Sequence, residues 1–465
     1  MFTFAVRSQR PVRAPLHWGW MQRTDRRPAP EAQQRAAQRA LCIAAMPDGE
    51  DLSELEELLR TAGVGVVGEL IQRREHVHPN TYIGPGKVAE AKALAHACDA
   101  NLIACDDELT ARQERNLEQE LGLPVVDRTT VILDIFASHA GSAEGKLQVE
   151  LAQLEYNLAR MRGLWSHLER LGGGIGTRGP GETQIETDRR LARNRIATLR
   201  RRLEHVKGTR AVQRAERERA ALPTIALVGY TNAGKSTLLN ALTAAFGRGA
   251  RAEVSVRDRL FHTLDPTTRT LRLDGRAHLL TDTVGFISKL PHQLVDAFAA
   301  TLEETRRAEL LVHVLDASAP EERQEIMRRA VEQTLEEIGA AHDGAHPEGH
   351  VQAGERPRVL ALNKIDLLDA DAREELRFRY PDAVLVSGAT GEGLQALGER
   401  LERELAHTLR PLDLLVPYAD GGSLAALHEL AGEVSREDTA EGVRVHALVP
   451  ARLADRFARF AVAAS

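Results

Sequence analysis

Cysteine is scarce in this chain of 465 residues, and long apolar runs are missing. The three cysteines are Cys42, Cys98 and Cys105, an odd number whose spacing fits no metal site, so reduced buried thiols are expected. No apolar run approaches the roughly 20 residues of a membrane-spanning helix, and we therefore expect no membrane span. The formal net charge of −6 argues against a generally basic nucleic-acid-binding protein. Any contact with RNA must come from a local patch.

What the sequence does contain is a glycine-rich loop, Gly-Tyr-Thr-Asn-Ala-Gly-Lys-Ser, at residues 229–236. It follows the apolar run 224–228, which is typical of a buried strand, and a helical pattern follows it. This context indicates a P-loop, which holds phosphate oxygens with backbone N–H groups and a helix N-terminus, rather than a chance glycine-rich turn. Lys235 can reach the β- and γ-phosphates, and the Ser236 hydroxyl can ligate Mg²⁺. The predicted phosphate-binding residues are Gly229, Tyr230, Thr231, Asn232, Ala233, Gly234, Lys235, Ser236 and Thr237.

A second motif, Asn-Lys-Ile-Asp at residues 363–366, follows another strand-like run. A carboxylate at the end of a strand can accept hydrogen bonds from both N1–H and the 2-amino group of guanine, whereas adenine offers no such pair of donors. The tetrapeptide alone also fits a polar turn that caps a helix. Its place after the fourth strand-like run beyond the P-loop favours guanine binding. The predicted guanine-binding residues are Asn363, Lys364, Asp366, Ser387, Gly388 and Ala389.

Two further segments complete the predicted phosphate chemistry. Asp282 follows an apolar run and suits a water-mediated Mg²⁺ ligand, and the amide of Gly285 suits the γ-phosphate. Thr263 is predicted to ligate Mg²⁺ together with Ser236 while the γ-phosphate is present, with Thr267 and Thr268 as alternatives. The predicted switch I residues are Phe261, His262, Thr263, Leu264 and Asp265, and the predicted switch II residues are Asp282, Thr283, Val284 and Gly285.

Apolar residues at alternating spacings of four and three flank a glycine-rich string at residues 172–181. This pattern predicts two helices packed as an antiparallel hairpin, with the string at its tip. From Thr177 to Arg210 the chain has ten lysines and arginines against four acidic residues. Such an excess beside a glycine loop suits binding to RNA phosphates, and a solvated helix face is the alternative. The candidate RNA-binding residues are Arg178, Arg189, Arg190 and Arg193.

These patterns predict a multidomain α/β protein in five parts. Residues 1–38 are rich in arginine and proline, and we expect them to be disordered, or Met21 to be the true start. Strands and helices alternate over 39–142 as in a small parallel α/β domain, and 143–220 form the helical hairpin. A Ras-like GTPase domain is predicted at 221–409, with an inserted loop at 339–357, and a short α+β domain at 410–465.

The sequence also resembles a known family. Three segments are similar to those of the HflX translational GTPases: Asp-Thr-Val-Gly-Phe at 282–286, Leu-Asp-Pro-Thr-Thr-Arg at 264–269 and the string from Gly172 to Arg190. The resemblance runs from about residue 40 to the C-terminus. It implies a monomeric cytoplasmic protein that binds GTP and GDP, requires Mg²⁺, associates with the large ribosomal subunit and its RNA, and splits stalled or idle ribosomes. The chain departs from the family at its longer segment 246–251, at Gly388 in place of alanine, and at the insert.

Asn232 is a candidate K⁺ ligand. Its amide oxygen can face the phosphates, and an asparagine at this position resembles potassium-activated GTPases related to the family; the alternative is a hydrogen bond within the loop. Phe286 stands directly after Gly285, where a self-sufficient GTPase carries a water-orienting glutamine. We therefore expect slow intrinsic turnover that a partner or another residue accelerates.

Three functions remain open at this point. The first is a ribosome-splitting GTPase, the second a GTP-dependent RNA or ribosome-assembly scaffold with incidental hydrolysis, and the third a small-substrate P-loop kinase. The guanine motif argues against the third. Whether ATP is also hydrolysed stays open.

Overall fold

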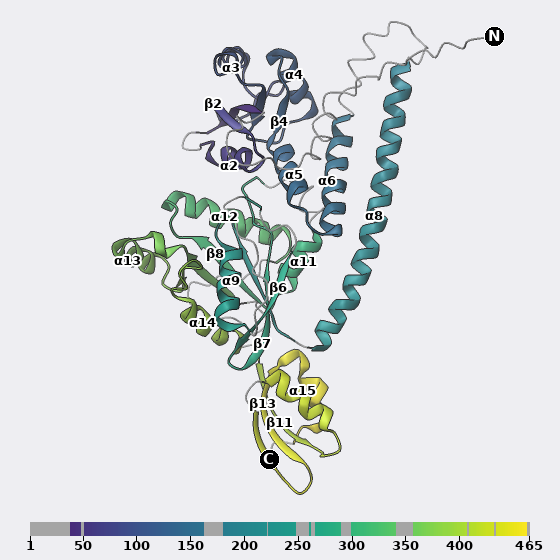
Figure 1. Cartoon of the computed structure of the whole chain (residues 1–465), viewed down its shortest axis with the longest axis vertical. Helices are drawn as coiled ribbons and strands as arrows, with labels where there is room; N and C mark the ends of the chain where they lie inside the picture. Colours follow the sequence, from purple (N-terminus) through teal and green to yellow (C-terminus); the bar gives the residue numbers. More distant parts are fainter. Residues whose placement is uncertain are drawn as a thin grey trace, which may run out of the picture. The chain divides into compact units, whose positions relative to one another are not determined.

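The structure is a computed structural model, and it describes residues 38–47, 51–161, 180–220, 222–247, 260–261, 266–289, 299–340, 357–406, 409–431 and 434–462. The chain divides into two units, Met1–Ala37 and Gln38–Ser465, of which the first lies outside the described residues. The described residues form three β-sheets (Figure 1). None of the helices they form is long and apolar enough to cross a membrane.

The first sheet has four parallel strands in the order β2-β1-β3-β4. Alternate residues of β1 enter two different cores, because successive side chains of a strand point to opposite faces. Helices α2 and α5 supply one of these cores, and α3 and α4 supply the other. The strands are β1 (Arg39–Met46), β2 (Gly65–Arg73), β3 (Leu102–Cys105) and β4 (Val125–Asp127), and the helices are α2 (Ser53–Thr61), α3 (Pro85–Ala97), α4 (Ala111–Leu121) and α5 (Arg128–His139).

Helix α5 is not indicated by the sequence patterns. Its buried residues include Val131, Ile132, Leu133, Ile135 and Phe136 together with the polar Arg128 and Thr129, so the buried face is broad and not purely apolar. The narrow apolar stripe that usually signals a surface helix is therefore blurred.

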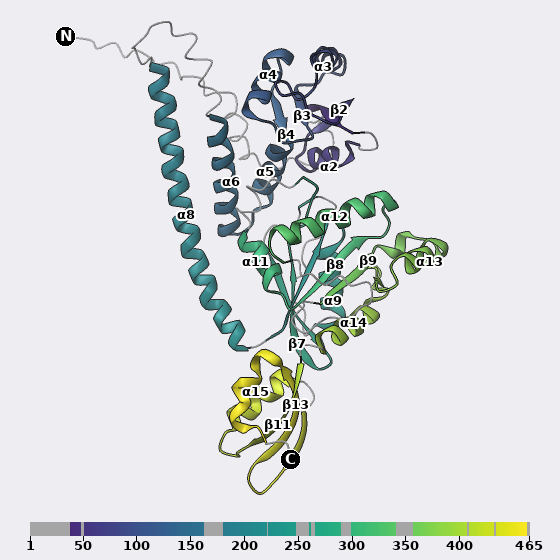
Figure 2. The same cartoon turned by 180° about the vertical axis from the view of Figure 1, so that it is seen from behind.

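Helices α6 (Ala143–Met161) and α8 (Pro180–Ala220) pack against each other (Figures 1 and 2). Their buried seam contains Leu151, Ile196, Leu199 and Leu203, at positions that the heptad pattern predicts. Residues 162–179 of the intervening segment lie outside the described residues. The last two residues of the predicted tip loop, 180 and 181, belong to helix α8 instead, since a proline is well suited to the first turn of a helix.

The second sheet has six strands in the order β10-β9-β8-β5-β7-β6, all parallel except β6, which pairs antiparallel to β7. Strand β5, which leads into the glycine-rich loop, is buried and central. The strands are β5 (Thr224–Gly229), β6 (Thr267–Leu273), β7 (Arg276–Asp282), β8 (Leu310–Asp316), β9 (Arg358–Asn363) and β10 (Val384–Leu385). The helices are α9 (Lys235–Phe246), α11 (Ala299–Arg307), α12 (Glu321–Glu337), η1 (Ile365–Leu367), α13 (Ala370–Arg379) and α14 (Leu394–Ala406).

The third sheet is antiparallel, in the order β11-β13-β12, and carries helix α15. Strand β12 is exposed along most of its length, so it lacks the alternation that would reveal it in the sequence. Segment Ala451–Phe460 forms a 3₁₀ helix. The elements are β11 (Leu409–Val416), α15 (Gly421–Ala431), β12 (Val434–Asp438), β13 (Val443–Pro450) and η2 (Ala451–Phe460).

The predicted multidomain α/β fold class is confirmed: a parallel α/β unit, a helical hairpin, a P-loop sheet and a small antiparallel sheet follow one another along the chain. The domain boundaries at residues 38, 142, 220 and 409 remain predictions.

Candidate nucleotide-binding site

The glycine-rich loop joins the end of β5 to the start of α9. Gly234 has φ +88°, and a Cβ on it would lie 2.3 Å from the side-chain nitrogen of Asn363, so the position requires glycine. Asn232 also has positive φ, at +60°, which asparagine adopts more readily than most residues. The backbone therefore turns tightly at the N-terminus of α9, where its dipole favours anions.

Lys235 lies inside this loop and is only 6% exposed. Its Nζ donates hydrogen bonds to the carbonyl oxygens of Gly229 at 3.0 Å and Tyr230 at 2.8 Å. Burial lowers the pKa of Lys235 to about 8, although the nearby Asp282 carboxylate acts in the opposite direction. A buried cation at a helix N-terminus has the electrostatics of a phosphate-binding group.

Two oxygen-bearing side chains lie beside the loop. The Ser236 hydroxyl donates to Asp282 Oδ2 at 2.6 Å, and Asp282, at the end of β7, is fully buried. Hydroxyl and carboxylate oxygens are hard ligands, and this pair fits a nucleotide-bound Mg²⁺, which needs few protein ligands. No group of three or more His, Cys, Asp or Glu able to hold a metal occurs among the described residues. Thr267 and Thr268 belong to β6, and Thr268 Oγ1 lies 3.0 Å from Thr281 Oγ1 on β7.

Phe261 is the one predicted switch I residue that the structure describes, since 262–265, including Thr263, lie outside the described residues. Its ring is buried and meets Phe136 of α5 edge to face, with 4.6 Å between the ring centroids. Phe261 therefore packs in a core, and the role of Thr263 as a Mg²⁺ ligand stays a prediction.

The switch II segment is paired with the glycine-rich loop. Phe286 accepts a hydrogen bond from the Thr231 amide at 2.7 Å and donates one to the Gly229 carbonyl at 3.1 Å. A Cβ on Gly285 would lie 2.9 Å from Thr231 Cα and 3.1 Å from Lys235 Nζ, so only glycine fits this approach. The structure thus places Gly285 directly against the predicted phosphate-binding groups.

The guanine-binding candidates meet at the carboxyl ends of β9 and β10. Asn363 Nδ2 donates to the Ala233 carbonyl at 2.9 Å, and its Oδ1 accepts from the Gly388 amide at 3.0 Å. Asp366 Oδ1 accepts a hydrogen bond from the Ser387 hydroxyl at 2.6 Å. Asn363 therefore connects the glycine-rich loop to segment 387–389.

Lys364, the remaining residue of this motif, has a left-handed backbone with φ +68°. Its Nζ forms an ion pair with Asp316 Oδ2 at the end of β8, at 2.7 Å. This contact holds the lysine stem at the edge of the sheet, beside the Asp366 loop. Ala389 is exposed.

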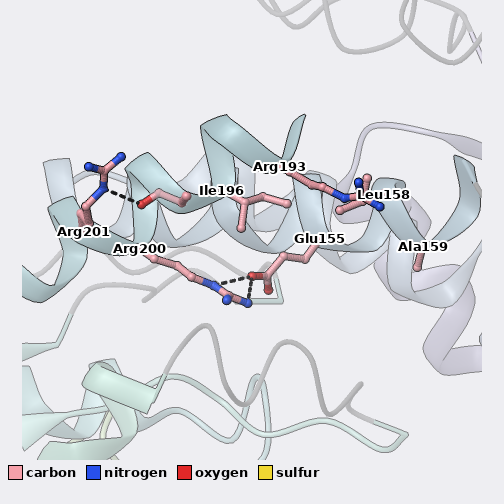
Figure 3. A pocket seen from close by; sticks show the side chains of 8 residues that line it. Glu155, Leu158, Ala159, Arg193, Ile196, Arg200 and Arg201 are labelled. Carbon is pink, nitrogen blue, oxygen red and sulfur yellow. Dashed lines mark hydrogen bonds and ion pairs between the residues drawn. The ribbon is translucent and has the colours of Figure 1, made fainter. Parts of the chain in front are cut away.

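The candidate RNA-binding arginines are only partly described. Arg178 lies outside the described residues, whereas Arg190 and Arg193 are exposed on α8. Arg193 lines an open groove of about 740 Å³ between α6 and α8 (Figure 3). Arg200, which lines the same groove, is paired with Glu155 at 2.7 Å. Part of the positive charge counted in the sequence is therefore neutralised within the hairpin.

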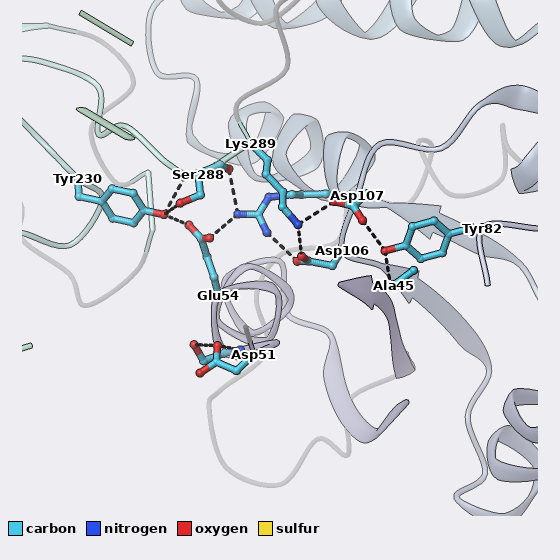
Figure 4. Close-up of polar contacts among 11 residues, drawn as sticks. Ala45, Asp51, Glu54, Tyr82, Asp106, Asp107, Tyr230, Ser288 and Lys289 are labelled. Atoms are coloured by element: carbon cyan, nitrogen blue, oxygen red, sulfur yellow. Dashed lines mark hydrogen bonds and ion pairs between the residues drawn. The ribbon is translucent and has the colours of Figure 1, made fainter. Parts of the chain in front are cut away.

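Sequence reasoning misses a buried polar cluster beside the glycine-rich loop. Arg128 in the first turn of α5 contacts Glu54 and Asp106, and also the carbonyl of Ser288 beyond switch II. Figure 4 labels these three partners, Glu54, Asp106 and Ser288. One signal is available in the sequence: an arginine in the first turn opposes the helix dipole, which suggests that it has acidic partners elsewhere.

The fold and the site define a P-loop GTPase. A glycine-rich loop follows the central strand β5, a buried carboxylate lies at the end of β7, and Asn-Lys-x-Asp begins at the end of β9. The chain is 45% identical to the GTPase HflX of Caldanaerobacter subterraneus subsp. tengcongensis, over 92% of this chain and 95% of that protein. It is 47% identical to the GTPase HflX of Escherichia coli (strain K12), over 78% of this chain and 82% of that protein. The chain belongs to the HflX family of GTPases.

Family models match three parts of the chain. Residues 49–137 match the GTP-binding GTPase N-terminal family, 139–217 the GTP-binding GTPase Middle Region and 224–364 the 50S ribosome-binding GTPase family. Among solved structures, a GTP-binding protein from Sulfolobus solfataricus in complex with GDP is 25% identical, with a TM-score of 0.38, over 79% of this chain and 99% of that chain.

Proposed function

We propose that this GTPase binds the large ribosomal subunit in its GTP-bound form and splits stalled or idle ribosomes, acting as a cytoplasmic monomer. The observation that carries its guanine specificity is the double hydrogen bond of Asn363, which connects the glycine-rich loop to the segment beside Asp366. A carboxylate held in this way can accept from both donors of guanine, and an adenine would leave it unpaired. Specific binding of guanine also argues against a small-substrate P-loop kinase.

The chain's own groups account for phosphate binding. Lys235 offers its ammonium to the β- and γ-phosphates, and the Gly285 amide, which abuts Lys235 and Thr231, can donate to the γ-phosphate. Ser236 would hold Mg²⁺, with Asp282 acting through water and Thr263 as the further predicted ligand. When bound, Mg²⁺ neutralises charge that develops on the transferred phosphoryl group.

Association with the ribosome is supported by the match of residues 224–364 to a 50S ribosome-binding family and by the exposed arginines of α8. Arginines facing solvent on one helix suit contacts with RNA phosphates, which weaken as salt rises. The alternative, an assembly scaffold with incidental hydrolysis, would use the same surface without separating the subunits.

Sedimentation tests the proposal. Purified ribosomes are incubated with the protein and GTP, a non-hydrolysable GTP analogue or GDP, and the subunit profile is recorded together with the bound protein. We expect free subunits and large-subunit binding with the triphosphates, and loss of both with Lys235→Ala, which removes the phosphate-binding charge. Intact ribosomes carrying bound protein would favour the scaffold, and no binding at all would refute the proposal.

The salt dependence of binding tests the hairpin surface. The double variant Arg190→Ala/Arg193→Ala should weaken binding to large subunits and lower the slope of log K against log salt by about two, roughly one for each phosphate contact. Arg377→Ala, which removes an exposed arginine from α13, is the matched control and should leave the slope unchanged. Equal slopes for all three proteins would place the RNA contact elsewhere.

A further inference from the structure

Three segments of the GTPase unit that surround the predicted phosphate site contact the N-terminal α/β unit. They are the glycine-rich loop, the one described residue of switch I with Leu260 before it, and the residues directly after switch II. The contacts converge on a set of side chains that we call the interdomain polar cluster (Figure 4). It consists of Glu54, Asp106, Asp107, Arg128, Tyr230, Ser288 and Lys289.

Arg128 lies at the centre of this cluster and is 2% exposed. Its guanidinium pairs with Glu54 Oε2 at 2.6 Å and with Asp106 Oδ1 at 2.8 Å. The same group donates to the Ser288 carbonyl at 3.1 Å. Burial would lower the pKa of Arg128, but attraction to the two carboxylates raises it, so the group stays charged. A planar guanidinium is suited to holding several acceptors in fixed directions.

The glycine-rich loop enters the cluster through Tyr230. Its hydroxyl donates to the Glu54 carboxylate and accepts a hydrogen bond from the Ser288 amide at 2.8 Å. The Tyr230 carbonyl in turn accepts from Lys235 Nζ at 2.8 Å. Arg128 is thus connected through Glu54 and Tyr230 to the lysine that faces the predicted phosphate site.

The segment after switch II enters through Lys289. Its Nζ lies 2.8 Å from Asp106 Oδ2 and 2.7 Å from Asp107 Oδ1, and its backbone has φ +55°, an uncommon value for a lysine. The two aspartates follow β3, which neighbours β1 at the point where the strand order of this sheet reverses. Open α/β sheets bind ligands at such points. Here a lysine of the GTPase unit occupies it.

Switch I makes an apolar contact with the same unit. Phe261 packs on Phe136 of α5, and the Leu260 amide donates to Thr61 Oγ1 at the end of α2 at 3.3 Å. Helices α2 and α5 also carry Glu54 and Arg128. The same two helices therefore contact all three phosphate-site segments.

We propose that Arg128 is a positioning residue of the nucleotide site, and that through it the N-terminal unit couples to the glycine-rich loop and switch II. The proposal rests on the GTPase function given above. Arg128 holds Ser288 directly and holds Tyr230 through Glu54. It therefore also fixes the segment 285–289 against the glycine-rich loop. A nucleotide that shifts this segment changes the contacts of α2 and α5. Loss of those contacts displaces the groups at the phosphates, which changes the rate of hydrolysis.

The first experiment measures single-turnover GTP hydrolysis and nucleotide affinity for wild type, Arg128→Met and Arg128→Lys. Misplacement of reacting groups by about 1 Å can cost on the order of 100-fold in rate, so we expect Arg128→Met to lower the rate of hydrolysis about 10- to 100-fold. The affinity for GDP should stay within about threefold of wild type, because the P-loop contacts remain. Arg128→Lys, which keeps the charge, should recover part of the rate.

Arg160→Met is the matched control. Arg160 forms ion pairs with Asp127 at 2.6 Å and Glu114 at 2.9 Å within the N-terminal unit and hairpin, and no described contact joins it to the phosphate site. This variant should hydrolyse GTP as wild type does. A similar loss in both methionine variants would show a general effect of damaging the N-terminal unit and would overturn the proposal.

Because Arg128→Met leaves two carboxylates without their partner and can destabilise the fold, Lys289→Met provides a second test. The Lys289 side chain is 41% exposed, so its loss should be tolerated, and we expect a three- to tenfold fall in hydrolysis rate. Unchanged or faster hydrolysis in folded Arg128→Met and Lys289→Met would overturn the positioning role.

Amide exchange tests the coupling directly. Exchange in α2 and α5 should differ between GDP and a non-hydrolysable GTP analogue in wild type and in Arg160→Met, and this difference should disappear in Arg128→Met. A wild type that binds GTP but shows no such difference overturns the proposal alone. A wild type that binds no GTP overturns the proposed function as well, so the two failures are distinguishable.

Discussion

Replacement of Asn363 by alanine should destabilise the GTPase unit and weaken nucleotide binding together. The side chain is 2% exposed and makes two hydrogen bonds, to the Ala233 carbonyl and from the Gly388 amide. Alanine removes both bonds and leaves two backbone groups without these partners. No nucleotide contact by Asn363 itself is required for the effect.

The magnitude follows from the two bonds. Each contributes about 1 kcal/mol net, and a buried partner left unsatisfied adds a further penalty of about 1–3 kcal/mol that rearrangement offsets in part. We therefore expect a loss of about 3 kcal/mol in the free energy of unfolding. For a unit of this size that corresponds to a fall in Tm of roughly 6–12 °C. If about half of the loss also opposes nucleotide binding, affinity for GTP falls about tenfold.

The assay is thermal unfolding without nucleotide, followed by titration with a fluorescent GTP analogue. Asn116→Ala is the control, because Asn116 donates a single exposed hydrogen bond, to the Asn80 carbonyl at 2.8 Å. It should change stability by no more than about 0.5 kcal/mol. If Asn363→Ala melts within about 2 °C of wild type, the reasoning from the two bonds is wrong.

Three further outcomes are expected. Asp366→Asn should shift preference from GTP towards xanthosine triphosphate, whose 2-oxo group needs a donor, and equilibrium binding that still favours GTP would contradict base reading by Asp366. GTP turnover should be faster in KCl than in NaCl at equal ionic strength and lose this difference in Asn232→Ala; equal wild-type rates would contradict a K⁺ site. GTP affinity should be constant below the Lys235 pKa of about 8 and fall above it by up to about tenfold per pH unit, because the neutral amine must regain a proton before it binds phosphate. Calorimetry should then show proton uptake on binding, and an affinity that stays constant above pH 8 would contradict this role of Lys235.

The nucleotide site is predictable because each of its motifs is local and parallel topology brings the motifs together. The carboxyl ends of β5, β7 and β9 meet at one edge of the sheet, so residues 234, 282 and 363 become neighbours although they are far apart in the sequence. The contact of Asn363 with the glycine-rich loop follows from this alone.

The interdomain polar cluster could not be predicted in the same way. Glu54 and Arg128 belong to one sheet unit and Tyr230 and Lys289 to another, and no spacing within either unit specifies how the two dock. Arg128 follows Asp127, which caps α5 through the Thr130 amide, and its place in the first turn is a signal only once the start of α5 is known. Helix α5 buries Arg128 and Thr129 together with its apolar residues, so its buried face is not a plain apolar stripe, and this hides the element that carries the arginine.

The position after Gly285 shows how the sequence and the structure constrain catalysis together. Phe286 is 1% exposed, and its backbone holds switch II to the glycine-rich loop through hydrogen bonds at both of its polar groups. A glutamine there would place an amide among apolar side chains, at the cost of burying a polar group without partners. The side chain of residue 286 therefore supports the fold at this point and cannot orient a water molecule. The orienting group has to come from another residue or from a partner, which is why we expect intrinsic hydrolysis to be slow and a bound partner to accelerate it.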